Sequence, residues 1–332
     1  MNFLVINIKK YFFTIIISLF TISLIFFSDT NLLAAKTGLT LWANNIIPCL
    51  FPFFVATELL CKTNLTNILG KLLNKFIKPI FNVPGESSTA IILGTLSGYP
   101  VGAKVVSNLK HEKIISKIEA ERLIAYTNNS GPLFILSTVG ISLFNNKKLG
   151  FVLLFSHILS AFLVAYFFRF WKKEKTEISF KENNFNEKSL PIKLSNFGEL
   201  LGDSIKSSIF NLLSIGGFVV LFSVILSILK STEIIQICSY SLSILNIPLD
   251  ISFSFLTGII EITNGVNLAS SLCETYYLSS ILLTSFLLGF GGFSVLLQVY
   301  SIISKENISI KPYIIGKFLH GIFSVIFTYI LL

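Results

Sequence analysis

The chain has 332 residues, of which 53% are hydrophobic and only 13% are charged, and its mean hydropathy is +0.77. A soluble domain carries about 25% charged residues, so this composition excludes an ordinary soluble protein and indicates one that crosses a membrane several times. The net charge of +9 does not predict a nucleic-acid partner, because the lysines stand in short loops between apolar runs, where they set membrane topology.

The N-terminal unit, residues 1–37, is predicted to hold a first membrane span at residues 11–28 and a loop after it. A signal peptide is the alternative, but no small-residue cleavage site follows the apolar run. A second span is predicted over residues 39–60. Residues 64–81 place apolar side chains at helical spacing with lysines opposite, which predicts a helix that lies along the membrane interface.

Residues 88–108 start like a membrane helix, break at residues 97–100 (Ser-Gly-Tyr-Pro) and then resume. Each apolar arm has about seven to ten residues, whereas a span needs roughly 20. Broken backbone at membrane depth is tolerated only where protein buries it or where it lines a wet cavity. We therefore predict a re-entrant hairpin whose tip belongs to a binding site. A kinked ordinary helix with a packing role is the alternative.

A broken span is predicted next, over residues 123–144, with its break at residues 128–132 (Asn-Asn-Ser-Gly-Pro). With the unbroken span that follows it, this span completes a first repeat at residues 38–171. Residues 172–202 are polar and charged and are predicted to form a cytoplasmic linker.

Residues 203–332 repeat this order of elements and are predicted to form the second repeat. A span and a short interfacial helix precede a second hairpin at residues 250–271, which breaks at residues 261–265. A second broken span at residues 278–303 and a terminal span follow. Four matched positions at nearly constant separation support the repeat: Asn45 with Asn211, Asn82 with Asn246, Gly94 with Gly258, and Gly131 with Gly291.

The distribution of lysines predicts the orientation. With a cytoplasmic N-terminus most lysines fall on the inside, in accord with the positive-inside rule; the pair Lys147 and Lys148 in an outside loop is the exception. The first hairpin then enters from the inside and the second from the outside, so the two repeats are inverted. We predict an all-α polytopic membrane protein with two inverted-topology repeats, the architecture of secondary transporters whose sites form at the midplane.

The two tips and two breaks are predicted to meet near the centre of the molecule. Half-helices aim partly positive N-termini there, and their free backbone N–H groups can bind an anion without an arginine. The predicted partners are thus a small anion and the lipid bilayer. The candidate substrate-binding residues are Ser97, Gly98, Tyr99, Pro100, Asn128, Asn129, Ser130, Gly131, Glu261, Thr263, Asn264, Gly265, Gly291 and Gly292.

The ionisable residues at membrane depth have open roles. Glu261 is either a coupling site for protons or cations or a structural carboxylate bonded to backbone N–H groups of its hairpin. Glu58, near a span end, is expected to face the surface, and Lys104 to reach the inner interface. The remaining polar residues at this depth are expected to be neutral. No catalytic constellation, metal ligand set, cofactor site or disulfide framework is predicted from the spacing, so an enzyme is not expected.

Four motifs resemble the YlbJ (SpoVV) family of sporulation integral membrane proteins, which belongs to the nucleoside-recognition, or Gate, domain group. They are LSGYPVGAKV (residues 96–105), TNNSGPLFI (127–135), EITNGVN (261–267) and GFGGFSVLLQ (289–298). The resemblance implies a multi-pass protein of the outer forespore membrane that moves dipicolinic acid from the mother cell toward the forespore.

Two alternatives stay open. The chain could be a structural or assembly protein of sporulation, which would tolerate changes at the hairpin tips. It could also be a nucleoside transporter or sensor, which would need hydrogen bonds to a ring edge. The sequence leaves a homo-oligomer open.

Overall fold

The computed structural model describes residues 2–62, 65–172 and 194–332, and all regular structure in these residues is helical. Four described helices are long and apolar enough to cross a membrane, and a bent pair of N-terminal helices would make a fifth span. The composition and these helices agree on an all-helical membrane protein. The long helices are Lys147–Phe168, Asn196–Ser231, Tyr277–Glu306 and Lys311–Leu331.

The N-terminal region differs from the prediction. Helix α1 (Asn2–Phe26) meets α2 (Ser28–Leu41) at a sharp bend, and the two axes make an angle of 99°. Helix α2 continues through a π-helical segment, η1 (Trp42–Ile46), into α3 (Ile47–Cys61). The loop predicted before residue 39 is therefore wrong. The helical segment packs along α9, where Gly38 lies against Ser223 and leaves no room for a larger residue.

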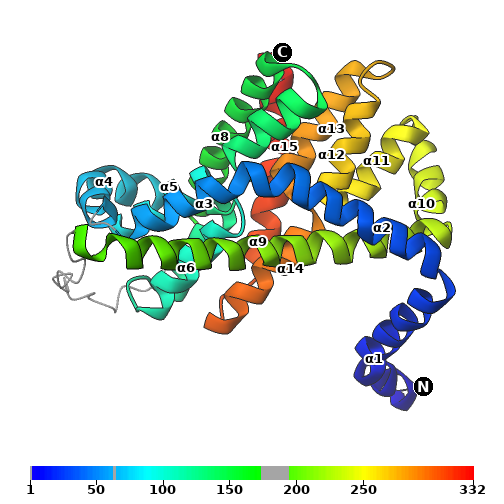
Figure 1. The fold of residues 1–332 in the computed structure, drawn as a ribbon, viewed down its shortest axis with the longest axis horizontal. Helices are drawn as coiled ribbons and strands as arrows, with labels where there is room; N and C mark the ends of the chain where they lie inside the picture. The colour runs from blue at the N-terminus through cyan, green and yellow to red at the C-terminus, as the bar shows by residue number, and fades with distance from the viewer. Residues whose placement is uncertain (1, 63–64, 173–193) are drawn as a thin grey trace.

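Helix α9 (Leu194–Ser231) is the longest element that the structure describes. Figure 1 shows it in green, crossing the molecule beside the blue chain of α2 and α3, and it packs on both. Its first turns include residues 194–202, which were predicted to belong to the linker. The rest of the predicted linker, apart from Lys172, lies outside the described residues.

Both predicted hairpins consist of two short helices packed on each other. The first pairs α5 (Ser88–Ser97) with α6 (Val101–His111), and the second pairs α11 (Leu249–Ile260) with α12 (Ile262–Ser271). A glycine from each arm allows the close approach: a Cβ on Gly94 would meet Gly102, and one on Gly265 would meet Gly258. The glycine pairs stand at corresponding places in the two halves, so both hairpins close in the same way.

The two halves contain the same order of elements. An amphipathic helix precedes each hairpin, an interrupted helix follows it, and an uninterrupted long helix comes last. In the first half these are α4 (Leu65–Phe81), the hairpin α5–α6, α7 (Lys117–Thr127) with the π-helical η3 (Phe134–Leu143), and α8 (Lys147–Phe168). In the second half they are α10 (Ile234–Ser243), the hairpin α11–α12, α13 (Tyr277–Phe290) with α14 (Gly292–Ile303), and α15 (Lys311–Leu331). The inverted relation between the halves stays a prediction.

Candidate functional site

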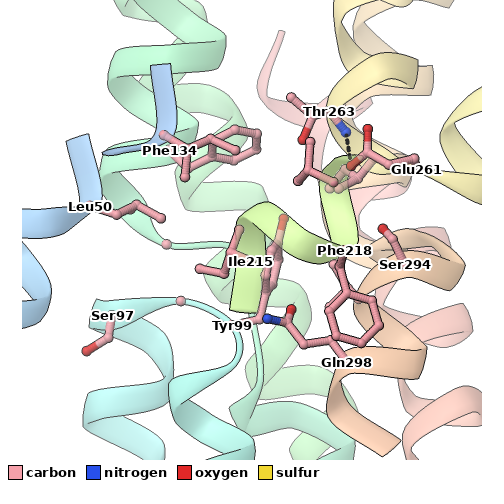
Figure 2. A pocket seen from close by; sticks show the side chains of 16 residues that line it. Leu50, Ser97, Tyr99, Phe134, Ile215, Phe218, Glu261, Thr263, Ser294 and Gln298 are labelled. Carbon is pink, nitrogen blue, oxygen red and sulfur yellow. Dashed lines mark hydrogen bonds between the residues drawn. The ribbon is translucent and has the colours of Figure 1, made fainter. Parts of the chain in front are cut away.

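A cavity lies where the two hairpin tips approach α9 (Figure 2). About 540 Å³ of space free of atoms lies between its lining residues, a figure that includes open solvent. Both halves of the chain contribute to it. The lining residues are Ile46, Leu50, Ser97, Gly98, Tyr99, Gly131, Phe134, Ile215, Phe218, Val219, Glu261, Ile262, Thr263, Ser294, Val295 and Gln298.

Glu261 is the one carboxylate of this cavity, and it is bonded to its own hairpin. Its two oxygens accept hydrogen bonds from the backbone N–H groups of Thr263 and Asn264, at 3.1 and 2.8 Å, and from the Asn264 amide at 2.8 Å. The side chain thus caps α12 and balances the positive end of the helix dipole. The expectation of free N–H groups at this helix start is wrong, because Glu261 already occupies them.

The first hairpin tip is held in a comparable way. The side-chain oxygen of Asn128 accepts a hydrogen bond from the backbone N–H of Ala103, in the first turn of α6, at 3.3 Å. The backbone N–H of Tyr99 donates to the carbonyl of Asn129 at 2.8 Å. Gly98 has a φ of +78°, which favours glycine, and its backbone lies against Gly131. The first tip and the first break therefore form one joined unit.

Two polar side chains of the cavity have no hydrogen-bond partner in the described part of the chain. They are the Ser97 hydroxyl and the amide nitrogen of Gln298, and both residues are buried. An unpaired buried donor costs free energy comparable to a lost hydrogen bond, so these groups are suited to binding a solute. The hydroxyl-bearing residues Thr263 and Ser294 also line the cavity.

Apolar and aromatic side chains form most of the remaining wall. Phe134 comes from the first interrupted helix, Phe218 and Ile215 from α9, and Leu50 from α3 (Figure 2). Aromatic faces offer a flat apolar surface for a ring. The arrangement suits a small planar molecule with polar groups on its edge.

Three predicted binding residues at the first break bond to protein and do not line the cavity. The Asn128 amide donates to the Tyr313 hydroxyl at 3.0 Å, and the Asn129 amide donates to the carbonyl of Tyr126 at 2.7 Å. The Ser130 hydroxyl donates to the carbonyl of Leu288 at 3.0 Å. These groups fix the break against α15 and α13.

The other predicted residues divide between the cavity and its support. Ser97, Gly98, Tyr99, Gly131, Glu261 and Thr263 line the cavity, whereas Pro100, Asn264, Gly265, Gly291 and Gly292 do not. The Asn264 amide reaches the Ser223 hydroxyl of α9 at 3.2 Å. Gly291 and Gly292 have φ values of +88° and +77°, so they form the break between α13 and α14.

Sequence reasoning missed Gln298 and a buried lysine, Lys317. Lys317 is only 2% exposed, and its ammonium donates to the carbonyl of Asn128 at 3.2 Å and to the Asn129 side-chain oxygen at 3.5 Å. The prediction that the remaining polar residues at this depth are neutral thus overlooked an ionisable side chain. The signal was a lysine within an apolar 21-residue helix, three residues before His320.

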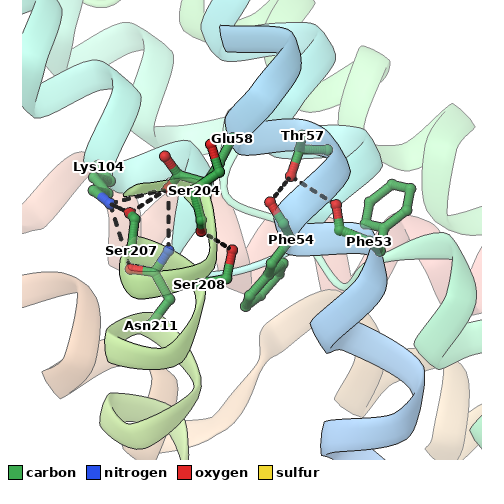
Figure 3. Close-up of polar contacts among 9 residues, drawn as sticks. All are labelled: Phe53, Phe54, Thr57, Glu58, Lys104, Ser204, Ser207, Ser208 and Asn211. Atoms are coloured by element: carbon green, nitrogen blue, oxygen red, sulfur yellow. Dashed lines mark hydrogen bonds and ion pairs between the residues drawn. The ribbon is translucent and has the colours of Figure 1, made fainter. Parts of the chain in front are cut away.

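Glu58 and Lys104 also differ from expectation, because each bonds to the other. Lys104 Nζ lies 3.2 Å from Glu58 Oε1, and both contact Ser207 and Asn211 of α9 (Figure 3). The first hairpin is thus joined to α3 and α9 by a polar cluster that includes an ion pair.

Comparisons with known proteins agree with this architecture. A family model described as Gate, nucleoside recognition, matches residues 43–170. The sporulation integral membrane protein YlbJ of Bacillus subtilis strain 168 is 35% identical over 313 residues, which cover 90% of this chain and 76% of that protein. The chain belongs to the YlbJ family of sporulation integral membrane proteins. No solved structure matches.

The four motifs that resemble the YlbJ family can now be placed in the structure. The Gate match covers the first hairpin and the first break, whose residues 97–99 and 131 line the cavity. The other two motifs contain Glu261 and Gln298, which line it from the second half. All four motifs therefore contribute to one cavity.

Proposed function

We propose that this protein is a transporter of a small planar solute, and that the solute binds in the cavity between the two hairpin tips. The observation that carries the proposal is the convergence of both tips, the first break, α14 and α9 on one cavity. Broken helices from two halves of a membrane protein form the solute sites of many secondary transporters. The re-entrant hairpins, the inverted repeats and the cytoplasmic N-terminus belong to this proposal.

Dipicolinate is the proposed solute, moved from the mother cell toward the forespore across the outer forespore membrane. Membership in a sporulation family supports this choice, and so does the chemistry of the cavity. The pyridine ring would lie against Phe134 or Phe218. Its two carboxylates would accept hydrogen bonds from the Gln298 amide and from the Ser97, Thr263 and Ser294 hydroxyls.

A nucleoside is the second candidate solute. It is favoured by the Gate match, whose description is nucleoside recognition, and by the pairing of a carboxylate with an amide in one cavity. Glu261 and Gln298 can together accept from and donate to the edge of a base.

Uptake into liposomes that contain the purified protein tests the proposal. Labelled dipicolinate and a labelled nucleoside are compared in parallel, with empty liposomes as the blank. Gln298→Ala should weaken binding of the transported solute about ten- to a hundredfold, since a hydrogen bond to a charged group contributes roughly 1.5–3 kcal/mol. Tyr300→Phe, at an exposed position of the same helix, is the matched control.

Each outcome of this test is informative. If dipicolinate is taken up, and Gln298→Ala weakens this uptake, the full proposal is supported. If only the nucleoside is taken up, the solute is a nucleoside, and the cavity is still the proposed binding site. If neither solute enters and spores made with Gln298→Ala contain normal dipicolinate, the structural or assembly role is favoured.

A further inference from the structure

Lys317 is a buried lysine with no carboxylate partner in the described part of the chain. It lies on α15, and no ion pair involves it. An ionisable residue within a membrane helix is costly and usually functional. The cavity does not use it directly, since Lys317 is not among the lining residues.

The surroundings of Lys317 match the hydrogen-bonding capacity of an ammonium group. Its Nζ lies near three acceptors: the Asn128 carbonyl at 3.2 Å, His320 Nδ1 at 3.4 Å and the Asn129 side-chain oxygen at 3.5 Å. An ammonium has three N–H donors, whereas a neutral amine has only two. The protonated form therefore satisfies all three partners, and the neutral form leaves one without a donor.

The hydrogen bonds of His320 fix its tautomer. Its Nε2 lies 2.9 Å from the carbonyl of His157, and a carbonyl can only accept, so Nε2 carries a hydrogen. In the neutral ring Nδ1 is then an acceptor that faces Lys317. A proton can pass from Lys317 Nζ to His320 Nδ1, which leaves a neutral amine and an imidazolium and breaks and forms only N–H bonds.

His157 extends this cluster onto α8. Its ring centre lies 4.3 Å from that of His320, it is 2% exposed, and neither of its ring nitrogens has a hydrogen-bond partner among the described residues. A buried imidazole with two unpaired nitrogens can take up a proton or a hydrogen-bonding ligand. His157 contacts His320 through both its ring and its backbone carbonyl.

The cluster is connected to the first hairpin through Asn128 and Asn129. Lys317 bonds to the side chain of Asn129, and the carbonyl of Asn129 accepts the N–H of Tyr99 at 2.8 Å. Tyr99 belongs to the tip of the first hairpin and lines the cavity. A change in protonation at Lys317 therefore alters the hydrogen bonds that hold the tip of the first hairpin.

We propose that Lys317, His320 and His157 form a proton-binding site that is thermodynamically linked to solute binding at the cavity. The inference deepens the proposed function and rests on it for the solute. Linkage is reciprocal: if the proton favours one position of the tip, a solute that binds that position favours the proton by the same factor. The proton then serves as a coupling ligand bound outside the solute cavity.

Helices α7, α8 and α13 pack on α15. Helix α13 carries only Tyr277, at its start, and α8 carries Lys147, Lys148 and Tyr166 besides His157. Helix α7 contains the buried Tyr126. Helix α15 itself carries Lys311, Tyr329 and Tyr313, which bonds to Asn128. The charged residues of α7 are Lys117, Glu119, Glu121 and Arg122. Glu121 and Arg122 bond near Trp171, and Glu119 caps its own helix.

The first test measures thermal unfolding of the purified full chain at a series of pH values, with no solute present. Lys317→Gln should change the shape of the curve of melting temperature against pH by removing one protonation step. His320→Gln should displace that step along the pH axis, because it removes the imidazole that can share the proton with Lys317. Lys311→Gln, at an exposed position of the same helix, should give a curve parallel to that of the unaltered protein.

A Lys317→Gln curve parallel to the unaltered protein would overturn the proton-binding site. If Lys317→Gln cannot be purified, His320→Gln and His157→Gln decide in its place, and parallel curves for both overturn it. This test needs no solute, so its result stands even if the proposed transport function fails.

The second test measures coupling in liposomes that enclose a pH-sensitive dye. A gradient of the transported solute should drive proton movement in the unaltered protein and in Lys311→Gln. Lys317→Gln should lose this proton movement while still binding solute in an equilibrium assay. Proton movement that persists unchanged in Lys317→Gln overturns the linkage.

Discussion

Lys104 of the first hairpin and Glu58 of α3 form an ion pair, with Lys104 Nζ and Glu58 Oε1 3.2 Å apart. Ser207 of α9 donates to the same carboxylate oxygen at 2.8 Å. The pair thus joins α6, the second arm of the hairpin, to α3, and Ser207 joins the same cluster to α9. Any movement of this hairpin relative to α3 and α9 must break these bonds.

A double-mutant cycle on this pair should show coupling. Lys104→Gln and Glu58→Gln are each expected to destabilise the protein, and the double variant should cost less than the sum of the two. The expected coupling energy is roughly 0.2–1 kcal/mol, the range for pairs with solvent-exposed partners, since the Lys104 side chain is 37% exposed. Unfolding in detergent measures it, and strictly additive effects would show that the pair does not interact.

Glu261 is expected to act first as the cap of α12. Glu261→Gln replaces one acceptor oxygen by an NH2 group, so one of the three N–H donors of Thr263 and Asn264 loses its partner. The expected loss of stability is about 1–3 kcal/mol, seen as a lower melting temperature. Glu261→Asp keeps a carboxylate at a position where aspartate is a good helix cap and should lose less.

The transport assay separates this role from ion coupling. If Glu261 acts only as a helix cap, uptake by Glu261→Gln should depend on the ion gradient as uptake by the unaltered protein does. A variant with normal melting temperature whose uptake no longer responds to a proton or cation gradient would assign the coupling role to Glu261.

Gly94 is expected to be essential to the packing of the first hairpin. A Cβ at this position would overlap the carbonyl oxygen of Thr127, which belongs to the backbone and cannot rotate away. Gly94→Ala should therefore destabilise the protein by about 1–3 kcal/mol, the usual cost of overpacking. Gly217→Ala is the matched control, because a Cβ there meets nothing within 4 Å, and it should be neutral or stabilising. Equal melting temperatures for the two variants would contradict the close approach.

The helix breaks were predictable because their signals are local. Glycine and proline interrupt apolar runs at Gly98, Pro100 and Gly291, and the structure ends helices at these places. The helical residues 28–38 were missed, although Leu32, Ala34 and Ala35 are good helix formers. The packing of Gly38 on α9 could not be read from this local pattern.

The candidate site was less predictable because it depends on which distant residues meet. The sequence placed Asn128 and Asn129 at a break, but it could not show that Tyr313 and Lys317 of the last helix would bond to them. Gln298 is part of the motif at residues 289–298, but only the packed structure shows that it lines a cavity together with Tyr99 and residues of α9. Whether a polar residue binds solute or protein is a property of the packed structure.

The ends of the two hairpins are expected to lie on opposite sides of the membrane, as the inverted repeats require. Figure 1 places the end of α6 at the bottom of the molecule and the turn from α12 to α13 at the top. His111 at the end of α6 lies 3.0 Å from Glu306, just after α14, so the lower ends of both halves meet there. If the membrane lies between these ends, the two turns face opposite sides.

Cysteine labelling with a membrane-impermeant reagent measures this directly. Cys273 lies in the turn after α12 and is partly exposed, so it serves as one probe after the other three cysteines are replaced. Glu112→Cys, at an exposed position after α6, provides the second probe in a chain without Cys273. We expect Glu112→Cys to label on the side of the N-terminus and Cys273 on the opposite side, in agreement with the lysine distribution. Labelling of both from one side would contradict the inverted repeats, and with them the argument that the two tips enter the membrane from opposite faces.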